Sequence, residues 1–322
     1  MNFGIELVPN VDCGQILELA KIAEESNFDY IWVTDHYCNR NVYSVLTLLA
    51  IKTSKVKLGA GVANPYHVHP AITASAIATV NEISNGRAVL GLAAGDRLVL
   101  NEIGITWDRP IKRIKEAVDV IRLLFSGDRV SYNGEFFKLS NAKLNFKSGN
   151  VKIFIGAQGP KMVKLAVEIG DGLLMNSSNP QDYVQLKSIV KKKEFELAAF
   201  TSFCMDKNSA KAKDYVRNVV AFIIASSSSA FLKRYGFEEK AEEIRKSILK
   251  RNWSEIKSIV SDEIVEIMSL SGSEDEIIEK IDKFKKFGVN QIVIGSPIGL
   301  DKKRTIKEFG ERIISLFKEE LK

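Results

Sequence analysis

The amino-acid sequence predicts an α/β fold of the TIM (β/α)8 barrel type, formed by a single domain over residues 1–322. Three observations support this prediction. The chain has 322 residues, of which 45% are hydrophobic, so it can bury one large core of the size that such a barrel needs. Short β-rich runs alternate with amphipathic helical runs over most of the length, which is typical of a parallel sheet. There are eight of these runs, so the last strand can pair with the first and close the sheet.

The predicted strands are short apolar runs, and several end in glycine or polar residues. In chain order they cover residues 3–8, 30–35, 56–62, 87–94, 151–157, 172–176, 196–205 and 291–296. The final run KKRTIKEFGERIISLFKEEL then provides the eighth helix. No G-x-G-x-x-G follows the first strand and no Walker pattern is present, so neither a Rossmann domain nor a P-loop is indicated.

Two segments interrupt the alternation of strands and helices. After the fourth strand, residues 128–150 predict a short hairpin insertion with an Asn-Gly turn at Asn133 and Gly134. After the seventh strand, residues 207–288 contain several helical patterns where one helix would suffice. We expect this second insertion to cap the barrel rather than to form a separate fold.

Charge and cysteine content exclude several classes of protein. The formal net charge is +6, but basic and acidic residues are interleaved, and no basic stripe with aromatic residues indicates nucleic-acid binding. Three cysteines lie far apart without a C-x-x-C pattern, so the sequence predicts neither a disulfide framework nor a zinc site. The start MNFGIELVPN lacks the features of a signal peptide, and no apolar run is long enough to span a membrane. We therefore expect a soluble, cytoplasmic protein.

Glu6 is the most informative single residue. In a barrel the reactive face is the carboxyl end of the strands. In the first strand the bulky Phe3, Ile5 and Leu7 alternate with Gly4, Glu6 and Val8, so the bulky set should face the helices and Glu6 should point into the barrel. Burial raises the pKa of a carboxyl toward the range that suits a general acid. A structural glutamate, bonded to a lysine or to backbone amides, is the alternative.

Polar residues also follow the second and third strands. Asp35 and His36 end the second strand, and we expect them to hydrogen-bond a ligand; the alternative is that Asp35 caps the next helical turn. His67 and His69 have the spacing of a metal pair, but no third ligand lies near them in the sequence, so no metal is predicted.

Two glycine-containing stretches could lie against a ligand. After the fifth strand, Pro160 occupies the position where a helix would start, so the free amides there, with Lys161, can hold a phosphate; close packing of strand and helix would also explain the glycines. The two glycines of LGAGV indicate a bulge or the close approach of a flat ring to Gly61 and Val62, with tight interior packing as the alternative.

Longer stretches resemble a known family. The segments MNFGIELVPN, WVTDHYCNRNVYSVLTLLA, KLGAGVANPYHVHPAITASAIATVNEISNGRAVLGLAAGD, IGAQGPKMVKLAVEIGDGLLMNSSNP and GSPIGLDKK together resemble the methylenetetrahydromethanopterin reductases, which are bacterial luciferase-like barrels. The resemblance runs from the first strand to the last helix. It implies the cofactor coenzyme F420, a deazaflavin, and reversible hydride transfer to the one-carbon bridge of methylenetetrahydromethanopterin. It also implies a non-prolyl cis peptide between Gly61 and Val62, behind the deazaflavin ring.

The resemblance assigns roles to twelve residues. Glu6 and Asp96 would face the pterin, and one of them, Glu6 in preference to Asp96, would protonate its arylamine nitrogen so that the bridge opens to an iminium cation. The remaining ten would contact coenzyme F420. Asp35 and His36 would lie at the polar edge of the deazaflavin, with Gly61, Val62 and Asn64 beside the ring, and the phosphate and its linker would lie against Ala157, Gln158, Gly159, Asn176 and Ser177.

The sequence departs from the family pattern over residues 224–237, IASSSSAFLKRYGF, in the expected cap. Two alternatives to the pterin reductase therefore remain: another luciferase-like oxidoreductase that uses coenzyme F420 or FMN on a different substrate, and a relative that binds the deazaflavin without turnover. The family further implies a homo-oligomer, either a dimer or a tetramer.

Overall fold

The structure, a computed structural model, is a closed barrel of eight parallel strands and describes residues 1–192 and 194–319. Around the barrel the strands are β9 (Glu196–Met205), β11 (Gln291–Gly295), β1 (Asn2–Leu7), β2 (Tyr30–Val33), β3 (Lys57–Ala63), β4 (Ala88–Leu92), β7 (Lys152–Gly156) and β8 (Gly172–Asn176). β8 pairs back to β9, which closes the sheet. The predicted pairing of the last strand with the first is confirmed, with Phe3 opposite Ile292.

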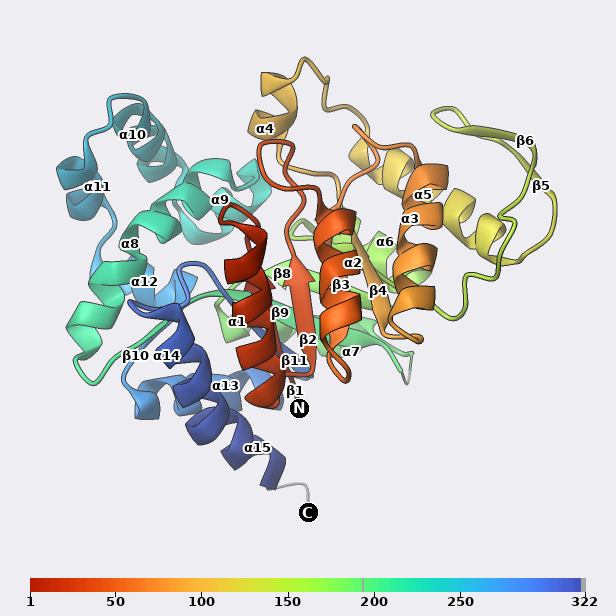
Figure 1. Cartoon of the computed structure of the whole chain (residues 1–322). Coiled ribbons are helices and arrows are strands. Elements are labelled where there is room, and N and C mark those ends of the chain that lie inside the picture. The colour runs from red at the N-terminus through yellow and green to blue at the C-terminus, as the bar shows by residue number, and fades with distance from the viewer. Residues whose placement is uncertain (193, 320–322) are drawn as a thin grey trace.

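Helices cover the outside of the barrel (Figure 1). They are α1 (Cys13–Glu25), α2 (Val42–Lys52), α3 (Pro70–Ile83), α5 (Pro110–Phe125), α6 (Pro160–Ile169), the 3-10 turn η1 (Pro180–Tyr183), α7 (Leu186–Ile189), α13 (Glu274–Lys286), and a last helix made of α14 (Lys302–Glu308), the π-helical turn η2 (Phe309–Ile314) and α15 (Ser315–Glu319). Side-chain caps fix several helix starts, because an oxygen there accepts from backbone N–H groups that lack a helical partner. Asp12 caps α1, Asn41 caps α2, and Ser273 with Glu276 forms a capping box on α13.

The outer faces of the strands pack against these helices. Phe3, Ile5 and Leu7 belong to this main core, as the alternation in the first strand predicted. The inner faces form a separate buried cluster that consists of Tyr30, Trp32, Val89, Phe154, Leu174, Ala198, Phe200 and Val293. These side chains fill the middle of the barrel, so a ligand can enter only from an end.

A charged network lies at the amino end of the barrel. The Glu196 carboxylate accepts hydrogen bonds from Tyr30 Oη at 2.8 Å and Lys152 Nζ at 2.9 Å, and Lys57 Nζ donates to Tyr30 Oη. Because this network and the aromatic cluster above it occupy the lower barrel, space for a ligand is left at the carboxyl end.

The hairpin predicted within residues 128–150 is present as β5 (Val130–Asn133) and β6 (Lys138–Ala142). Its turn differs from the prediction: Asn133 pairs with Lys138, so a four-residue connection that begins at Gly134 replaces the Asn-Gly turn. The buried Glu116 carboxylate of α5 accepts the backbone N–H groups of residues 135, 136 and 137. A long-range contact therefore sets the turn.

Residues 207–288 contain the predicted set of helices. They are α8 (Ser209–Ser226), α9 (Ser229–Tyr235), α10 (Glu238–Leu249), α11 (Trp253–Ile259) and α12 (Asp262–Met268), followed by α13. The first five have their own buried core, and Figure 1 shows them on the side of the barrel opposite the β5–β6 hairpin. The short strand β10 (Ser269–Gly272), which the sequence analysis missed, pairs with the end of β9.

Across the described residues, no helix is both long and apolar enough to cross a membrane.

Candidate active site

A cavity of about 1360 Å³ opens at the carboxyl ends of the strands. This volume exceeds that of a typical pocket for one small ligand, so two ligands can bind side by side. Eleven of the twelve residues that the sequence analysis assigned to the site line the cavity; Ser177 is the exception. Residues separated by up to 170 positions along the chain, Glu6 and Asn176, thus meet in one place.

Glu6 points into the barrel, as predicted, and lines the floor of the cavity. Its side chain fills the space that a side chain at Gly295 would need, because a Cβ there would lie 2.6 Å from Glu6 Oε2. Removal from water raises the pKa of Glu6 to about 7, and a hydrogen bond from the backbone of Ser296 only partly opposes this effect. At neutral pH the carboxyl is therefore protonated in a large fraction of molecules, which suits a general acid.

Asp35 and His36 follow β2 and both line the cavity. Asp35 does not cap the next helix; Asn41 does. Instead, Asp35 Oδ2 lies 3.4 Å from His67 Nε2 in the loop after β3. His69 turns away, since its Nδ1 accepts the backbone N–H of Ala71 at the start of α3. The two histidines therefore do not converge on one point, and the described residues contain no group of three or more potential metal ligands.

The peptide bond between Gly61 and Val62 is cis, as the resemblance implied, and lies in a bulge where the pairing of β3 with β4 shifts between Ala60 and Ala63. Trp32 packs directly beneath the bulge: a Cβ added at Gly61 would lie only 2.9 Å from Trp32 Cβ. A side chain at this position would collide with the wall of the barrel. The glycine thus lets the chain pass directly over the indole, and Gly61 and Val62 both line the cavity.

The helix start after β7 is as predicted: α6 begins at Pro160, with Gly159 as its N-cap. The first helical hydrogen bond runs from the Val163 N–H to the Gly159 carbonyl, so the N–H groups of Lys161 and Met162 precede it and face no carbonyl within the helix. Both residues line the cavity. A Cβ at Gly159 would meet nothing within 4 Å, so there is open space at this helix start. Such a start binds anions well.

Beside this helix start, Gln158 and Asn176 connect the ends of β7 and β8. The Gln158 Nε2 group donates to the Asn176 carbonyl at 2.9 Å. Ser177, the next residue after Asn176, is buried, and its hydroxyl donates to Asp182 Oδ2 at 2.5 Å. Its side chain therefore faces Asp182 rather than the cavity.

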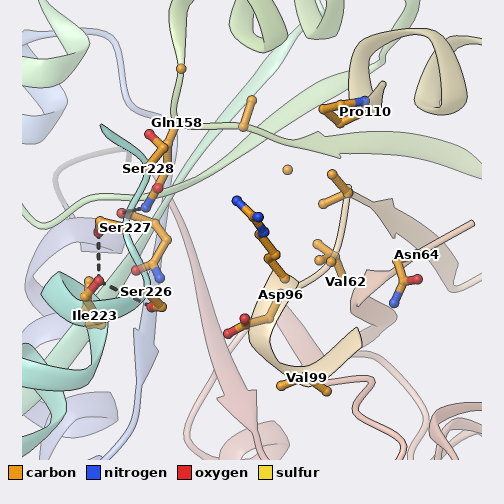
Figure 2. A pocket seen from close by; sticks show the side chains of 18 of the residues that line it. Val62, Asn64, Asp96, Val99, Pro110, Gln158, Ile223, Ser226, Ser227 and Ser228 are labelled. Carbon is orange, nitrogen blue, oxygen red and sulfur yellow. Dashed lines mark hydrogen bonds between the residues drawn. The ribbon is translucent and has the colours of Figure 1, made fainter. Parts of the chain in front are cut away.

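Asp96 lies in the glycine-flanked segment that leads from β4 into the short helix α4 (Arg97–Glu102). Figure 2 shows it between the side chains of Val62 and Asn64 on one side and those of Gln158 and Ser226 on the other. Trp107 Nε1 donates to the Ala94 carbonyl at 3.0 Å and fixes the base of this segment. Asp96 thus lines the cavity at the end of β4.

Several cavity residues were missed by the sequence analysis. Ser226, Ser227, Ser228 and Ser229, at the junction of α8 and α9, form one wall (Figure 2). Thr34, His67, Trp107 and Arg245 also line the cavity. The serine run was visible in the sequence only as a departure from the family pattern within the expected cap, and no pattern in the sequence indicated that these serines line the cavity.

Known proteins resemble this chain over nearly its full length. The sequence profile of the luciferase-like monooxygenase family matches residues 1–291. A 5,10-methylenetetrahydromethanopterin reductase of Archaeoglobus fulgidus is 48% identical, over 99% of this chain and 100% of that protein. A reductase of the same name from Methanolobus tindarius is 44% identical, over 98% of this chain and 100% of that protein.

A solved structure agrees with these sequence matches. The coenzyme F420-dependent tetrahydromethanopterin reductase from Methanopyrus kandleri superimposes with a TM-score of 0.90 at 37% identity, over 98% of this chain and 99% of that one. The fold, the cavity at the carboxyl ends of the strands and this full-length similarity agree, and the chain belongs to the 5,10-methylenetetrahydromethanopterin reductases of the luciferase-like family.

Proposed function

We propose that the protein catalyses the reversible reduction of methylenetetrahydromethanopterin to methyltetrahydromethanopterin with coenzyme F420. The main support is the Glu6 carboxyl, whose pKa of about 7 suits a proton donor and which lines the same cavity as the Gly61–Val62 bulge. The chain is also 48% identical to a reductase of this name. When bound, coenzyme F420 supplies the hydride. The protein then has to bind both ligands, exclude water and provide one proton.

Glu6 is the proposed proton donor. The protonated carboxyl gives its proton to the arylamine nitrogen of the substrate, and the bond from that nitrogen to the bridging carbon breaks. The other bridged nitrogen donates its lone pair to that carbon, which gives an iminium cation that accepts hydride. Glu6 is left as a carboxylate in a site that disfavours the charge, so it takes up a proton again before the next turnover. Asp96 faces the same cavity, and we assign it to binding of the pterin.

The remaining predicted residues fit the parts of coenzyme F420. A flat ring fits against the backbone at Gly61 and Val62, with Asn64 beside it and Asp35 and His36 near its polar edge. The phosphate fits the N–H groups at the start of α6, next to Ala157, Gln158 and Gly159, with Asn176 close by. We propose that Ser177 acts indirectly, since its hydroxyl holds Asp182.

We also propose that the protein is a cytoplasmic homo-oligomer, a dimer or a tetramer, without a nucleic-acid or membrane partner. Light scattering of the purified protein at micromolar concentration tests the first point. A monomeric mass would contradict it.

The test of the function is anaerobic. The purified protein is mixed with reduced coenzyme F420 and methylenetetrahydromethanopterin, and the visible absorbance of the oxidised coenzyme is followed. We expect oxidation that depends on both the protein and the pterin. A coenzyme that binds but stays reduced would reject the pterin as substrate and favour one of the two alternatives.

A further inference from the structure

The Thr34 hydroxyl is a buried polar group without a partner. Thr34 follows β2 directly, is 8% exposed and lines the cavity. Its Oγ1 atom has no hydrogen-bond partner among the described residues. Buried hydroxyls in folded proteins nearly always have a partner, so an exception at a ligand cavity indicates that the partner is a ligand or a water molecule.

Other buried threonines of the same barrel follow the general rule. Thr201, which also lines the cavity, donates from Oγ1 to the Val293 carbonyl at 3.0 Å. Thr53, at the opposite end of the strands, donates to the Leu49 carbonyl at 2.7 Å. A threonine needed only for its shape in a strand could be a valine, because the two side chains have nearly the same form. We therefore expect the hydroxyl of Thr34 to bind a molecule other than the protein chain itself.

The position of Thr34 places it beside Glu6. In the pairing of β1 with β2, Glu6 lies opposite Trp32. Trp32 and Thr34 are two residues apart, so their side chains point to the same, inner face. The Trp32 Nε1 atom is likewise buried without a partner among the described residues. Thr34 thus lies two residues beyond Trp32 toward the carboxyl end of β2, on the strand next to Glu6.

We propose that Thr34 is a further substrate-binding residue, whose hydroxyl hydrogen-bonds the polar atoms of the tetrahydropterin next to the nitrogen that Glu6 protonates. The inference rests on the proposed function. A hydroxyl both donates and accepts, so one side chain can serve the substrate before and after the proton has moved. Rotation about the Cα–Cβ bond exchanges the hydroxyl and the methyl group, and this lets the hydroxyl face the ligand.

The test compares Thr34→Val, which removes only the hydroxyl, with Thr34→Ser, which keeps it. Calorimetry measures the Kd of methyltetrahydromethanopterin without coenzyme, and fluorescence measures the Kd of coenzyme F420 without pterin. Loss of one hydrogen bond predicts that Thr34→Val binds the pterin about 5- to 30-fold more weakly, while Thr34→Ser stays within about threefold of the wild type. The Kd of coenzyme F420 should change less than about threefold in both variants.

A stability measurement separates this role from a structural one. Because the buried hydroxyl has no partner among the described residues, it adds nothing to the fold, and Thr34→Val should raise the Tm of the ligand-free protein by about 2 to 4 °C. A hydroxyl that supports the fold would lower the Tm when removed. Thr79→Val, on the exposed face of α3, is the matched control and should bind both ligands as the wild type does.

Three results would overturn the inference: unchanged pterin affinity in Thr34→Val, a Thr34→Ser variant as weak as Thr34→Val, or a loss of affinity for coenzyme F420 in place of the pterin. Failure of the proposed function looks different, since the wild-type protein itself would then bind no pterin, and both proposals would fall.

Discussion

His67 Nε2 lies 3.4 Å from Asp35 Oδ2, so the loop after β3 is joined to the end of β2 at the edge of the cavity. The two side chains are only 18% and 10% exposed. A partner this close holds the Asp35 carboxylate in one orientation at the edge of the cavity.

Asp35→Ala should therefore weaken binding of coenzyme F420 about tenfold or more, because the polar edge of the ring loses a charged hydrogen-bond acceptor. Fluorescence titration of the coenzyme measures the effect. Asp128→Ala, in an exposed turn after α5, is the control and should bind as the wild type does. If the two variants bind equally well, Asp35 does not contact the coenzyme.

Lys161 stands at the start of α6 and lines the cavity, whereas Lys164 lies one turn further along on the same helix and does not. Lys161→Gln should weaken binding of coenzyme F420 about three- to tenfold at low salt, and less at high salt, because the lysine acts as an exposed charge near a phosphate. Lys164→Gln should have little effect. The same titration with a deazaflavin that lacks the phosphate should show no difference between the two variants. A difference there would place the phosphate elsewhere.

Glu6 should also make stability depend on pH. Its folded-state pKa is about 7, against 4.5 for an ordinary glutamate, so the folded state binds the proton more tightly than the unfolded state does. The stability that this proton contributes is fully present below pH 4.5 and is lost as the pH rises through about 7. Glu6→Gln removes this loss, since the amide is never charged.

Urea unfolding at pH 5 and pH 8 measures this effect. The free energy of unfolding of Glu6→Gln, relative to the wild type, should be higher at pH 8 than at pH 5 by about 1 to 2 kcal/mol, less than the full shift in pKa would give, because the side chain is partly exposed to the cavity. An equal difference at the two pH values would mean that the pKa of Glu6 is not raised.

Asp182 joins the loop after β8 to α9. Its carboxylate, 4% exposed, accepts from Ser177 Oγ at 2.5 Å, Tyr235 Oη at 2.7 Å and Arg234 Nη1 at 2.9 Å. Asp182→Ala should lower the free energy of unfolding by about 2 to 4 kcal/mol, because it leaves the buried Ser177 hydroxyl and the part-buried Tyr235 hydroxyl without their acceptor. Asp262→Ala removes an exposed partner of Arg217 and should lower it by less than about 1 kcal/mol. Similar losses in the two variants would show that the hydrogen bonds to Asp182 stabilise the fold no more than an exposed ion pair does.

The sequence predicted what local patterns determine. All eight barrel strands are present, and the alternation in the first strand placed Glu6 inside, because a buried sheet fixes which face each residue takes. Pro160 marked the start of α6 for an equally local reason. The resemblance to the family supplied the cis peptide between Gly61 and Val62, which strand patterns alone do not specify.

The missed features depend on contacts between distant segments. Asn133 and Gly134 look like a tight turn, but Glu116 holds the chain in a longer connection. For His67 and His69 the sequence analysis predicted no metal, but it did not predict that His67 contacts Asp35 or that His69 caps α3. The sequence analysis expected a cap from residues 207–288, but that Ser226 and its neighbours form a wall of the cavity depends on how α8 and α9 pack, which no spacing along the chain reveals.

Glu6 and Asp96 both face the cavity, so their roles can be separated by paired amide variants. Glu6→Gln should lower the rate of hydride transfer by about 10² to 10⁴ while the Kd of coenzyme F420 stays within about twofold. Asp96→Asn should raise the KM for the pterin and keep a measurable rate. The reverse pattern would make Asp96 the acid.

The most direct test of the account is the pH dependence of single-turnover oxidation of reduced coenzyme F420 by methylenetetrahydromethanopterin, in the wild type and in Glu6→Gln. If Glu6 donates the proton, the wild-type rate falls as the pH rises through about 7, because the reactive form is the protonated carboxyl, and the residual rate of Glu6→Gln does not show this fall. A Glu6→Gln variant that reacts at the wild-type rate, with the same dependence on pH, would contradict the account.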